Sequence, residues 1–267
     1  MSSVRLSVCI IACNEERDLP RCLASVAFAD EIVVVVDDRS SDATGKLALE
    51  AGARVEHHRY AGNVEQKNVA LELATGEWIL SLDADEAVTP ALAERIRTVL
   101  EREEPGAVGF EVNRITWHLG RWIHHGEFYP DWQLRLFERS AGRWEGENPH
   151  GRVEVAGTVA RLEGEIEHYS YRDLADQVER IQDFSGIQAE GYRAAGRPVR
   201  VVRDMVLRPP LRFLRAYLLK QGFRDGVPGL IIAAATAFHV FLKYAKLWEA
   251  QRVGAAEARA AGKPGRG

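Results

Sequence analysis

Three of four consecutive residues are acidic where the apolar segment at 78–82 ends, in the sequence Asp83-Ala84-Asp85-Glu86. Alternate side chains of an extended chain share a face, so Asp83 and Asp85 are predicted to point the same way. Two unpaired carboxylates that close raise each other's pKa, and a divalent cation removes the repulsion. Mg²⁺ or Mn²⁺ takes one or two carboxylates and completes its coordination with water and substrate phosphates. The spacing therefore predicts a Mg²⁺ or Mn²⁺ site at Asp83 and Asp85.

Helix capping is the alternative role for these acids, because a helix is predicted to begin just after them. Thr89 and Pro90 already supply an N-cap and a first-turn proline for that helix. Capping explains Thr89 and leaves the two aspartates without a role, which favours the metal site.

Two other residues, Asp37 and Lys67, are candidates for binding a ligand. One ends a predicted strand and the other stands near the start of a predicted helix. Asp37 ends the run EIVVVVD, and a carboxylate there can accept hydrogen bonds from a base N–H or a ribose hydroxyl. Lys67 stands near the start of a predicted helix and can reach a phosphate, although a single lysine is more often a solvated surface residue. Asp42 is better suited to capping the helix that follows it.

Apolar runs rich in β-branched residues alternate with amphipathic patterns up to Asp83. The runs predict strands over 6–12, 31–37, 54–58 and 78–83, and the amphipathic patterns predict helices over 17–26, 42–51 and 64–74. This alternation is typical of an α/β fold with a doubly wound, mostly parallel sheet that carries helices on both faces. Ligands bind outside the carboxyl ends of strands in such sheets, so the acidic segments are expected to converge on one edge.

The whole-chain composition argues against one class of partner. With 35 basic and 39 acidic residues the net charge is -4, which argues against nucleic-acid binding. The 3 cysteines are an odd number near the N-terminus, which fits a reducing compartment better than a disulfide framework. The N-terminal segment lacks the plan of a signal peptide, so a cytoplasmic location is expected.

The pattern changes after the first strands and helices. Short aromatic-rich strands are predicted from 106 to about 169, as antiparallel additions that complete a first domain of residues 1–170. A helix predicted over 171–195 opens a helical region of residues 171–250, and residues 251–267 are predicted to be a disordered tail.

Residues 197–248 combine positive charge with apolar side chains. Seven Arg and one Lys against a single acid, Asp204, lie between Arg197 and Arg224, and an apolar run of 16 residues follows at 227–242. A membrane-spanning helix needs about 20 apolar residues, so this run is too short to span. The combination predicts peripheral contact with an anionic membrane surface. The alternative is a helical appendage that packs on the rest of the protein or on a second subunit, with its arginines in water.

Four segments occur in order at suitable spacing: SVCIIACNEE, VVVVDDRSSDAT, QKNVAL and LSLDADE. Together they resemble the nucleotide-sugar half of an inverting family 2 glycosyltransferase with the GT-A fold. GEWILSLDADE, YPDWQLRLFER and IEHYSYRD further resemble the bacterial lipopolysaccharide-core glucosyltransferase-like branch of that family. The resemblance covers about residues 5 to 250. It implies that 1–170 is the nucleotide-sugar-binding and catalytic domain of a hexosyltransferase.

The resemblance implies which residues hold the nucleotide of a UDP-sugar donor. Ala12, Asn14, Glu15 and Asp37 match positions that hold the uridine in such enzymes. Lys67 lies in the segment that approaches the nucleotide.

The same resemblance assigns the acidic segment to the donor's diphosphate. Asp83, Ala84 and Asp85 match an Asp-X-Asp motif whose second aspartate is the direct ligand of Mg²⁺ or Mn²⁺ in relatives. The metal bridges the two phosphates of the donor and stabilises the charge on the departing diphosphate. Arg39 stands where this branch usually has glycine, and it is a further candidate for contact with the donor.

Few residues of the sequence point to the general base of the reaction. It deprotonates the acceptor hydroxyl, which attacks the anomeric carbon from the opposite face and inverts it. Relatives often carry His-Glu where this chain has His150-Gly151, and that glutamate is the natural base. Glu147 and His150 are therefore the candidates here, and a structural role is the alternative for His150. Other acids of this region are Asp131, Glu145 and Glu154.

The leading hypothesis is a metal-dependent inverting glycosyltransferase of cell-envelope polysaccharide or lipopolysaccharide synthesis. It is expected to move a sugar, with glucose as the first candidate, from a UDP-sugar to a glycan or lipid-linked acceptor at the inner face of the cytoplasmic membrane. A sugar nucleotidyltransferase is one alternative, disfavoured because the residues after the first strand include no Gly-rich loop. A non-catalytic nucleotide-binding relative is the other, and Gly151 is the residue that suggests it.

Overall fold

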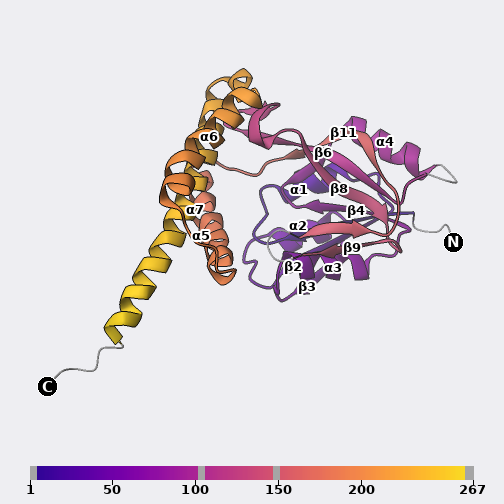
Figure 1. The fold of residues 1–267 in the computed structure, drawn as a ribbon. Coiled ribbons are helices and arrows are strands. Elements are labelled where there is room, and N and C mark those ends of the chain that lie inside the picture. Colours follow the sequence, from indigo (N-terminus) through magenta and orange to yellow (C-terminus); the bar gives the residue numbers. More distant parts are fainter. Residues whose placement is uncertain (1–4, 102–105, 147–150, 262–267) are drawn as a thin grey trace. The chain divides into compact units, whose positions relative to one another are not determined.

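The computed structural model describes residues 5–101, 106–146 and 151–261, and the chain forms two compact units (Figure 1). The first unit comprises residues 1–116 and 130–170, and the second comprises 117–129 and 171–267. The chain passes from one unit to the other after residues 116, 129 and 170. The segment Trp117–Tyr129, which the sequence placed in the first domain, groups with the second unit instead.

A mixed sheet organises the first unit, with strand order β3-β2-β1-β4-β8-β6-β11-β5 and with β7 paired to β6. The strands are β1 (Leu6–Ala12), β2 (Glu31–Asp37), β3 (Arg54–His58), β4 (Trp78–Asp83), β5 (Glu86–Val88), β6 (Gly109–His118), β7 (Arg121–Ile123), β8 (Asp131–Glu138) and β11 (Val159–His168). The predicted bounds of the first four strands are confirmed. A separate antiparallel pair consists of β9 (Gly142–Glu145) and β10 (Arg152–Val155).

The direction of the strands changes at β4. Strands β3, β2, β1 and β4 are parallel to one another. Strand β8 runs antiparallel to both β4 and β6, while β11 is parallel to β6 and antiparallel to β5. The predicted antiparallel additions after residue 106 are therefore present, and they extend the sheet on the β4 side.

Helices cover both faces of this sheet because successive strand residues point to opposite sides. The helices are α1 (Leu19–Ser25), α2 (Thr44–Glu50), α3 (Asn63–Leu73) and α4 (Pro90–Leu100). Ile10 of β1 is buried with Leu19 of α1 and Leu92 of α4, whereas its neighbour Cys9 is buried with Ala70 of α3. The predicted α/β fold, a doubly wound and mostly parallel sheet between two helical layers, is confirmed.

The predicted cap of α4 is also present. Thr89 is the N-cap, its side chain accepts a hydrogen bond from the Leu92 N–H, and Pro90 occupies the first turn. The Thr89 hydroxyl also donates to the Glu165 carbonyl oxygen, which ties α4 to β11.

Gly164 marks a bulge where β11 passes α4. The pairing of β11 with β6 shifts register between Leu162 and Glu165, and Gly164 has φ +104°. A Cβ at this position would lie 2.8 Å from backbone atoms of Leu92. Both the backbone conformation and the close approach of α4 therefore require glycine here.

We expect Gly164→Ala to lower the free energy of unfolding by about 3 kcal/mol, because it combines left-handed backbone strain with a clash against helix backbone. Gly52→Ala is the matched control, since Gly52 has φ +81° but nothing within 4 Å of the added Cβ. The control should cost only about 1 kcal/mol. Urea titrations followed by circular dichroism measure both values, and equal losses would show that the contact with α4 adds nothing.

The second unit is helical. Its helices are α5 (Leu174–Ala194), the π-helical segment η2 (Val202–Leu207), α6 (Arg208–Leu214), the π-helical segment η3 (Arg215–Leu219), the short η4 (Gly222–Asp225) and α7 (Gly226–Ala261). The predicted helix over 171–195 corresponds to α5. Helix α7 runs to Ala261, so residues 251–261, which were predicted to be disordered, continue it. Ala, Glu, Gln and Arg dominate these residues, and they are strong helix formers.

Buried charge holds the segment Trp117–Tyr129 in the second unit. The Asp225 carboxylate is 1% exposed and accepts a hydrogen bond of 2.7 Å from the His125 N–H. Arg121 donates to the Asp225 carbonyl oxygen, and Glu127 pairs with Arg212 at 2.7 Å. Sequence patterns do not reveal these pairs, because their members are up to 104 residues apart.

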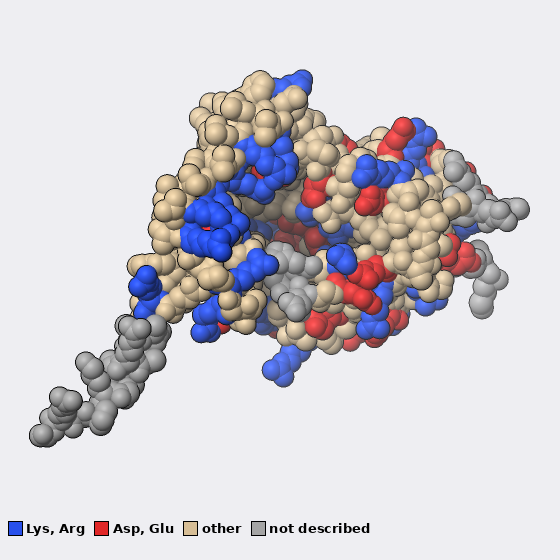
Figure 2. All heavy atoms as spheres, in the orientation of Figure 1, with Lys and Arg blue, Asp and Glu red and all other residues tan. Residues whose placement is uncertain are grey.

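The last helix contains an apolar stretch slightly longer than the 16-residue run. An 18-residue window within residues 222–253 has a mean hydropathy of 1.6, and within the described residues this is the one helix long and apolar enough to cross a membrane by length and composition. Only 22% of its most apolar stretch is buried inside the protein. Lys and Arg side chains gather over the helices of this unit (Figure 2). Apolar and basic surfaces thus lie on the same unit, as the sequence predicted.

Candidate active site

The candidate site lies at the carboxyl ends of β1, β2 and β4. The chain adds β2 and β3 on one side of β1 and β4 on the other, so β1 and β4 flank the topological switch point. Asp83, the last residue of β4, is in register with Ile11 of β1, and Asp37 is the last residue of β2. Such a switch point is where open α/β sheets bind their ligands.

Asp83 is held by two cations. Its Oδ1 lies 2.7 Å from Lys67 Nζ of α3, and its Oδ2 lies 3.2 Å from an Nη of Arg135 of β8. Burial works against ionisation of Asp83, but the charges of Lys67 and Arg135 outweigh it and hold the pKa of Asp83 well below its usual range. Both carboxylate oxygens are therefore engaged, and Asp83 stays ionised.

Lys67 is a buried residue rather than the solvated surface lysine that is the commoner case. Its side chain is 9% exposed, and Nζ lies 4.0 Å from the centre of the Trp144 ring. Burial lowers the pKa of Lys67, while Asp83 opposes the shift. Arg135 lies over the same indole, at 5.8 Å. Trp144 thus forms an aromatic floor under both cations.

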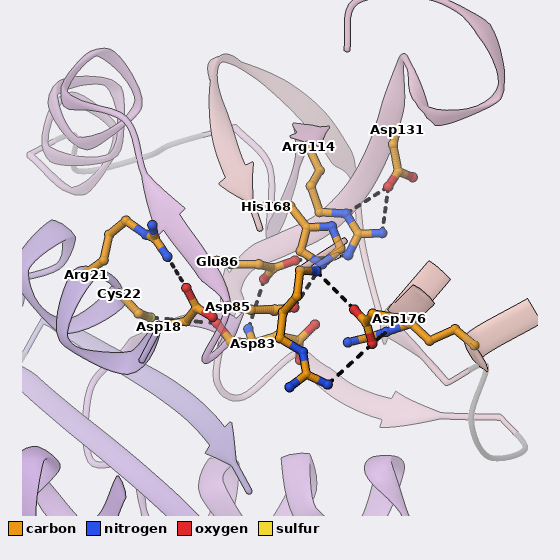
Figure 3. Close-up of polar contacts among 12 residues, drawn as sticks. Asp18, Arg21, Cys22, Asp83, Asp85, Glu86, Arg114, Asp131, His168 and Asp176 are labelled. Atoms are coloured by element: carbon orange, nitrogen blue, oxygen red, sulfur yellow. Dashed lines mark hydrogen bonds and ion pairs between the residues drawn. The ribbon is translucent and has the colours of Figure 1, made fainter. Parts of the chain in front are cut away.

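Glu86 extends the network to β6 and β8. Its buried carboxylate accepts hydrogen bonds from Arg135 at 2.7 Å and from Arg114 at 3.0 Å. Arg114 also pairs with Asp131 at 2.7 Å. Figure 3 shows Arg114 between Glu86 and Asp131, directed toward the end of β4. The network therefore continues from the acidic segment to Asp131 at the start of β8.

Asp85 has a different partner. Its Oδ2 lies 3.3 Å from His168 Nε2 at the end of β11, and its side chain is 20% exposed (Figure 3). Burial raises the pKa of Asp85, but the neighbouring His168 outweighs that effect and the net shift is downward.

The prediction that Asp83 and Asp85 share the face of an extended chain is wrong. Strand β4 ends at Asp83, and Ala84 and Asp85 form a turn. The two carboxylates therefore meet partners from different elements, and the cations Lys67 and Arg135 remove much of the expected repulsion at Asp83.

Hydrogen bonds join the loops after β1 and β2. The Asn14 N–H donates to Ser40 Oγ at 2.9 Å, and the Ser41 N–H donates to Asn14 Oδ1 at 2.8 Å. Asn14 has φ 56°, a left-handed conformation that asparagine tolerates. The Glu15 N–H donates to Thr44 Oγ1 at 2.7 Å. These bonds place Asn14 and Glu15 beside the end of β2.

Asp37 forms its closest contacts with Arg39. The Asp37 carboxylate accepts from the Arg39 backbone N–H at 2.8 Å and from its guanidinium at 3.0 Å, and these bonds keep the pKa of Asp37 low. The guanidinium also stacks 4.3 Å from the Tyr60 ring centre, although the Arg39 side chain is 65% exposed. Arg39 thus covers the carboxylate predicted to bind the nucleoside.

The remaining predicted residues differ in how the structure places them. Ala12 and Ala84 are buried and contribute no polar side chain to the site. Glu147 and His150, the predicted base candidates, lie outside the described residues. Among the other acids considered, Glu145 is exposed, Glu154 pairs with Arg152, and Asp131 is the one joined to the site through Arg114.

Asp85 fits a divalent cation better than Asp83 does. Both oxygens of Asp83 are engaged by cations, whereas Asp85 pairs with one described side chain, that of His168. Exposure does not separate the two, since the Asp83 side chain is 30% exposed and that of Asp85 is 20% exposed. No group of three His, Cys, Asp or Glu side chains with metal-site geometry occurs among the described residues. Mg²⁺ needs no such group, because one carboxylate with water and substrate phosphates suffices. The residues present therefore fit a site completed by a substrate.

Sequence reasoning missed Arg114, Arg135, Trp144 and His168. Arg135 had a readable signal, since an arginine inside the apolar strand segment LRLF of β8 must find a carboxylate when it is buried. Its Nε and Nη1 are buried and have no hydrogen-bond partner among the described residues. Arg114 and His168 come from strands far along the chain that the sheet order brings near β4. Trp144 belongs to the separate β9–β10 pair, and hydrogen bonds between its backbone and the Asn68 side chain of α3 place it beside Lys67.

The sequence profile described as Glycosyl transferase family 2 matches residues 7–160, more than half of the chain. The chain belongs to glycosyl transferase family 2. The family resemblance predicted from its motifs is thereby confirmed, and the protein is a glycosyltransferase enzyme. Family 2 membership also favours a transferase over the nucleotidyltransferase alternative.

Named proteins are similar to this chain over most of its length. This family 2 chain is 30% identical over 256 residues to the lipopolysaccharide core biosynthesis glycosyltransferase LpsC of Rhizobium meliloti (strain 1021), covering 91% of this chain and 92% of LpsC. It is 26% identical over 260 residues to an uncharacterized glycosyltransferase of Rickettsia felis, covering 92% and 90%. Among solved structures, S. aureus TarS 1-349 has a TM-score of 0.48 at 16% identity, covering 94% of this chain and 92% of that one.

We expect Lys67→Met to lower the free energy of unfolding by about 2 kcal/mol, because it leaves the half-buried Asp83 carboxylate with one cation fewer. Lys46→Met is the control, since Lys46 pairs with Glu50 on the surface of α2 with a side chain 75% exposed. The control should change stability by less than about 0.5 kcal/mol. Urea titration measures both variants. A Lys67→Met protein as stable as the control would mean that Asp83 is held without Lys67.

Proposed function

We propose that this glycosyltransferase moves a sugar, with glucose as the first candidate, from a UDP-sugar to a glycan or lipid-linked acceptor with inversion at the anomeric carbon. The observation that carries the proposal is the arrangement at the switch point, where Asp85 lies beside the Lys67–Asp83–Arg135 cluster at the end of β4. The similarity to LpsC supports a role in lipopolysaccharide or other cell-envelope polysaccharide synthesis.

The donor's nucleoside binds at the ends of β1 and β2 in this proposal. Asp37 accepts from the base or ribose, and the Asn14–Ser40 and Asn14–Ser41 bonds fix the loop beside it. Arg39 must release Asp37 for this to happen. Its exposed guanidinium can then turn toward the donor's diphosphate, exchanging one anion for another.

The diphosphate binds next to the acidic segment. Asp85 would hold Mg²⁺ or Mn²⁺, which stabilises the negative charge of the leaving diphosphate when bound. Lys67 and Arg135 keep Asp83 ionised and fixed, and the ion pairs restrict its carboxylate to one position. His168 orients Asp85 through Nε2 in the same way.

The acceptor hydroxyl must lose its proton to a base as it attacks. Glu147 and His150 remain our candidates for that base. Asp131 is a third, because its ion pair with Arg114 connects it to Glu86 and so to the acidic segment. A non-catalytic relative would bind the donor without turning it over, so a turnover assay distinguishes an active transferase from a non-catalytic nucleotide-binding protein.

We expect UDP to bind about 10-fold or more tightly with Mn²⁺ than with EDTA, and Asp85→Asn to remove that difference, because the metal links carboxylate and diphosphate. Glu50→Gln is the control, an acid on the surface of α2 paired only with Lys46 among the described residues. Isothermal titration calorimetry measures binding, and release of UDP from UDP-glucose measures turnover. Metal-independent binding by the parent protein would contradict the proposed diphosphate site. Metal-dependent binding with no turnover would favour the non-catalytic alternative.

We further propose that the second unit contacts the anionic inner face of the cytoplasmic membrane, where a lipid-linked acceptor would lie. Leu219 is 80% exposed and Val227 is 67% exposed, and Phe223 between them is also exposed. Arg215, Lys220 and Arg224 belong to the same short stretch of chain. Exposed apolar side chains next to cations suit the interface of an anionic leaflet.

We expect the double variant Leu219→Gln, Phe223→Gln to bind vesicles of phosphatidylcholine and phosphatidylglycerol at least about 10-fold more weakly, because two apolar side chains no longer enter the interface. Leu49→Gln is the control, an apolar side chain 61% exposed on α2 of the first unit. Co-sedimentation measures binding. If the parent protein fails to sediment with vesicles, or both variants sediment equally well, the membrane contact is refuted.

A further inference from the structure

The second unit contains a cavity that the transferase reaction described above does not use. Its volume is about 660 Å³, and it lies between α5, α6 and α7. One part of its lining is aromatic and aliphatic: Phe128, Tyr171, Ile181, Tyr192, Leu211 and Val240. Four cations complete it: Arg208, Arg212, Arg215 and Lys243. Cavities of this size hold small organic ligands.

The cations around this cavity outnumber the acids. Asp204 is fully buried and is shared by Arg203 at 2.7 Å and Arg208 at 3.1 Å. Glu127 is shared by Arg212 at 2.7 Å, Lys220 at 3.3 Å and Arg215 at 4.0 Å. Two carboxylates thus serve five cations, and no acidic side chain of the described chain lines the cavity itself.

Lys243 adds a further positive charge on the cavity wall. Its Nζ lies 5.0 Å and 5.2 Å from the ring centres of Tyr192 and Tyr244, and none of the described carboxylates pairs with it. Burial, and after it the charges of Lys243 and Lys246, lower the pKa of the neighbouring His239. Arg212 also has a buried Nε without a hydrogen-bond partner in the described residues.

Three of the lining cations share two carboxylates and Lys243 pairs with none of those described, so positive charge exceeds negative charge in a partly apolar cavity. Such a cavity suits an anion that carries an apolar portion. Proteins commonly bind phosphate through the guanidinium group of arginine and the ammonium group of lysine. The aromatic and aliphatic wall is placed to contact hydrocarbon, which an inorganic ion does not offer. We propose that this cavity binds a phosphorylated amphiphile, with its phosphoryl group at Lys243 and the arginines and its apolar portion against the aliphatic and aromatic lining. This site lies wholly within the second unit and is independent of the nucleotide site.

The test uses the full-length protein and three soluble probes. Dihexanoylphosphatidic acid has both the phosphoryl group and an apolar portion. Dihexanoylglycerol lacks the phosphoryl group, and inorganic phosphate lacks the apolar portion. The parent protein should bind the first probe at least about 10-fold more tightly than either of the others, measured by calorimetry. Equal binding of inorganic phosphate or of dihexanoylglycerol would refute an amphiphile site.

The variant Lys243→Gln assigns the binding to this cavity. We expect it to bind dihexanoylphosphatidic acid about 10-fold more weakly, the loss typical of one charge-assisted hydrogen bond. Arg252→Gln is the matched control, because it removes one positive charge from the exposed surface of the same helix, beyond the cavity lining. Circular dichroism establishes that both variants keep their helices. An equal loss in the two variants, or no loss in either, overturns the proposal.

A vesicle experiment then separates two sources of the phosphoryl group. If Lys243→Gln also weakens binding to vesicles that contain long-chain phosphatidic acid, while Arg252→Gln does not, the ligand is a membrane lipid. If only the dispersed short-chain probe depends on Lys243, the ligand is a free phosphorylated molecule, and the cavity assignment stands in both cases. UDP binding is unaffected by either outcome, so failure of this proposal is distinct from failure of the transferase proposal.

Discussion

The ion pairs that Asp83 makes with Lys67 and Arg135 are the interaction on which the rest of the site depends. A carboxylate at the end of a buried strand is costly unless opposite charge compensates it. Lys67 comes from α3 on one face of the sheet and Arg135 from β8, so one side chain joins three elements. Trp144 supports both cations, and Glu86 draws Arg114 into the same network. The acidic segment is therefore a fixed structure, within which we propose Asp85 as the carboxylate that would hold a substrate-bound cation.

Much of the first unit could be read from the sequence. Apolar runs such as EIVVVVD mark parallel strands that are buried on both faces, and the acids after them mark the edge where ligands bind. Local patterns of this kind suffice because a strand buried on both faces is apolar along its whole length, whichever strands it pairs with. Thr89 and Pro90 are a similar case, since a cap is defined by the residues next to it.

The partners of the acids could not be read in the same way. The pairing of Arg135 with Asp83 and of His168 with Asp85 follows from sheet order, which inserts β8 and β11 from the second half of the chain. The prediction that Asp83 and Asp85 share a face failed for a related reason. It assumed that the strand continues through Asp85, whereas the chain turns after Asp83. The cavity of the second unit could not be predicted from the sequence, because its lining residues come from α5, α6 and α7, which are separate in the chain.

The way the chain alternates between the two units limits how the protein can be divided. Residues 117–129 belong with the helices although the strands on either side of them, β6 and β8, are neighbours in the sheet of the first unit. A protein cut after Ser170 would keep Arg121, His125 and Glu127 but lose their partners Asp225 and Arg212. Glu127, which pairs with Arg212 in the full chain, would then lack that cation. Exchange of the helical part between relatives, in the laboratory or by recombination, therefore requires two inserted pieces that come from the same parent. The second unit is therefore built from two chain segments that must be exchanged together, and it cannot be removed as a C-terminal tail.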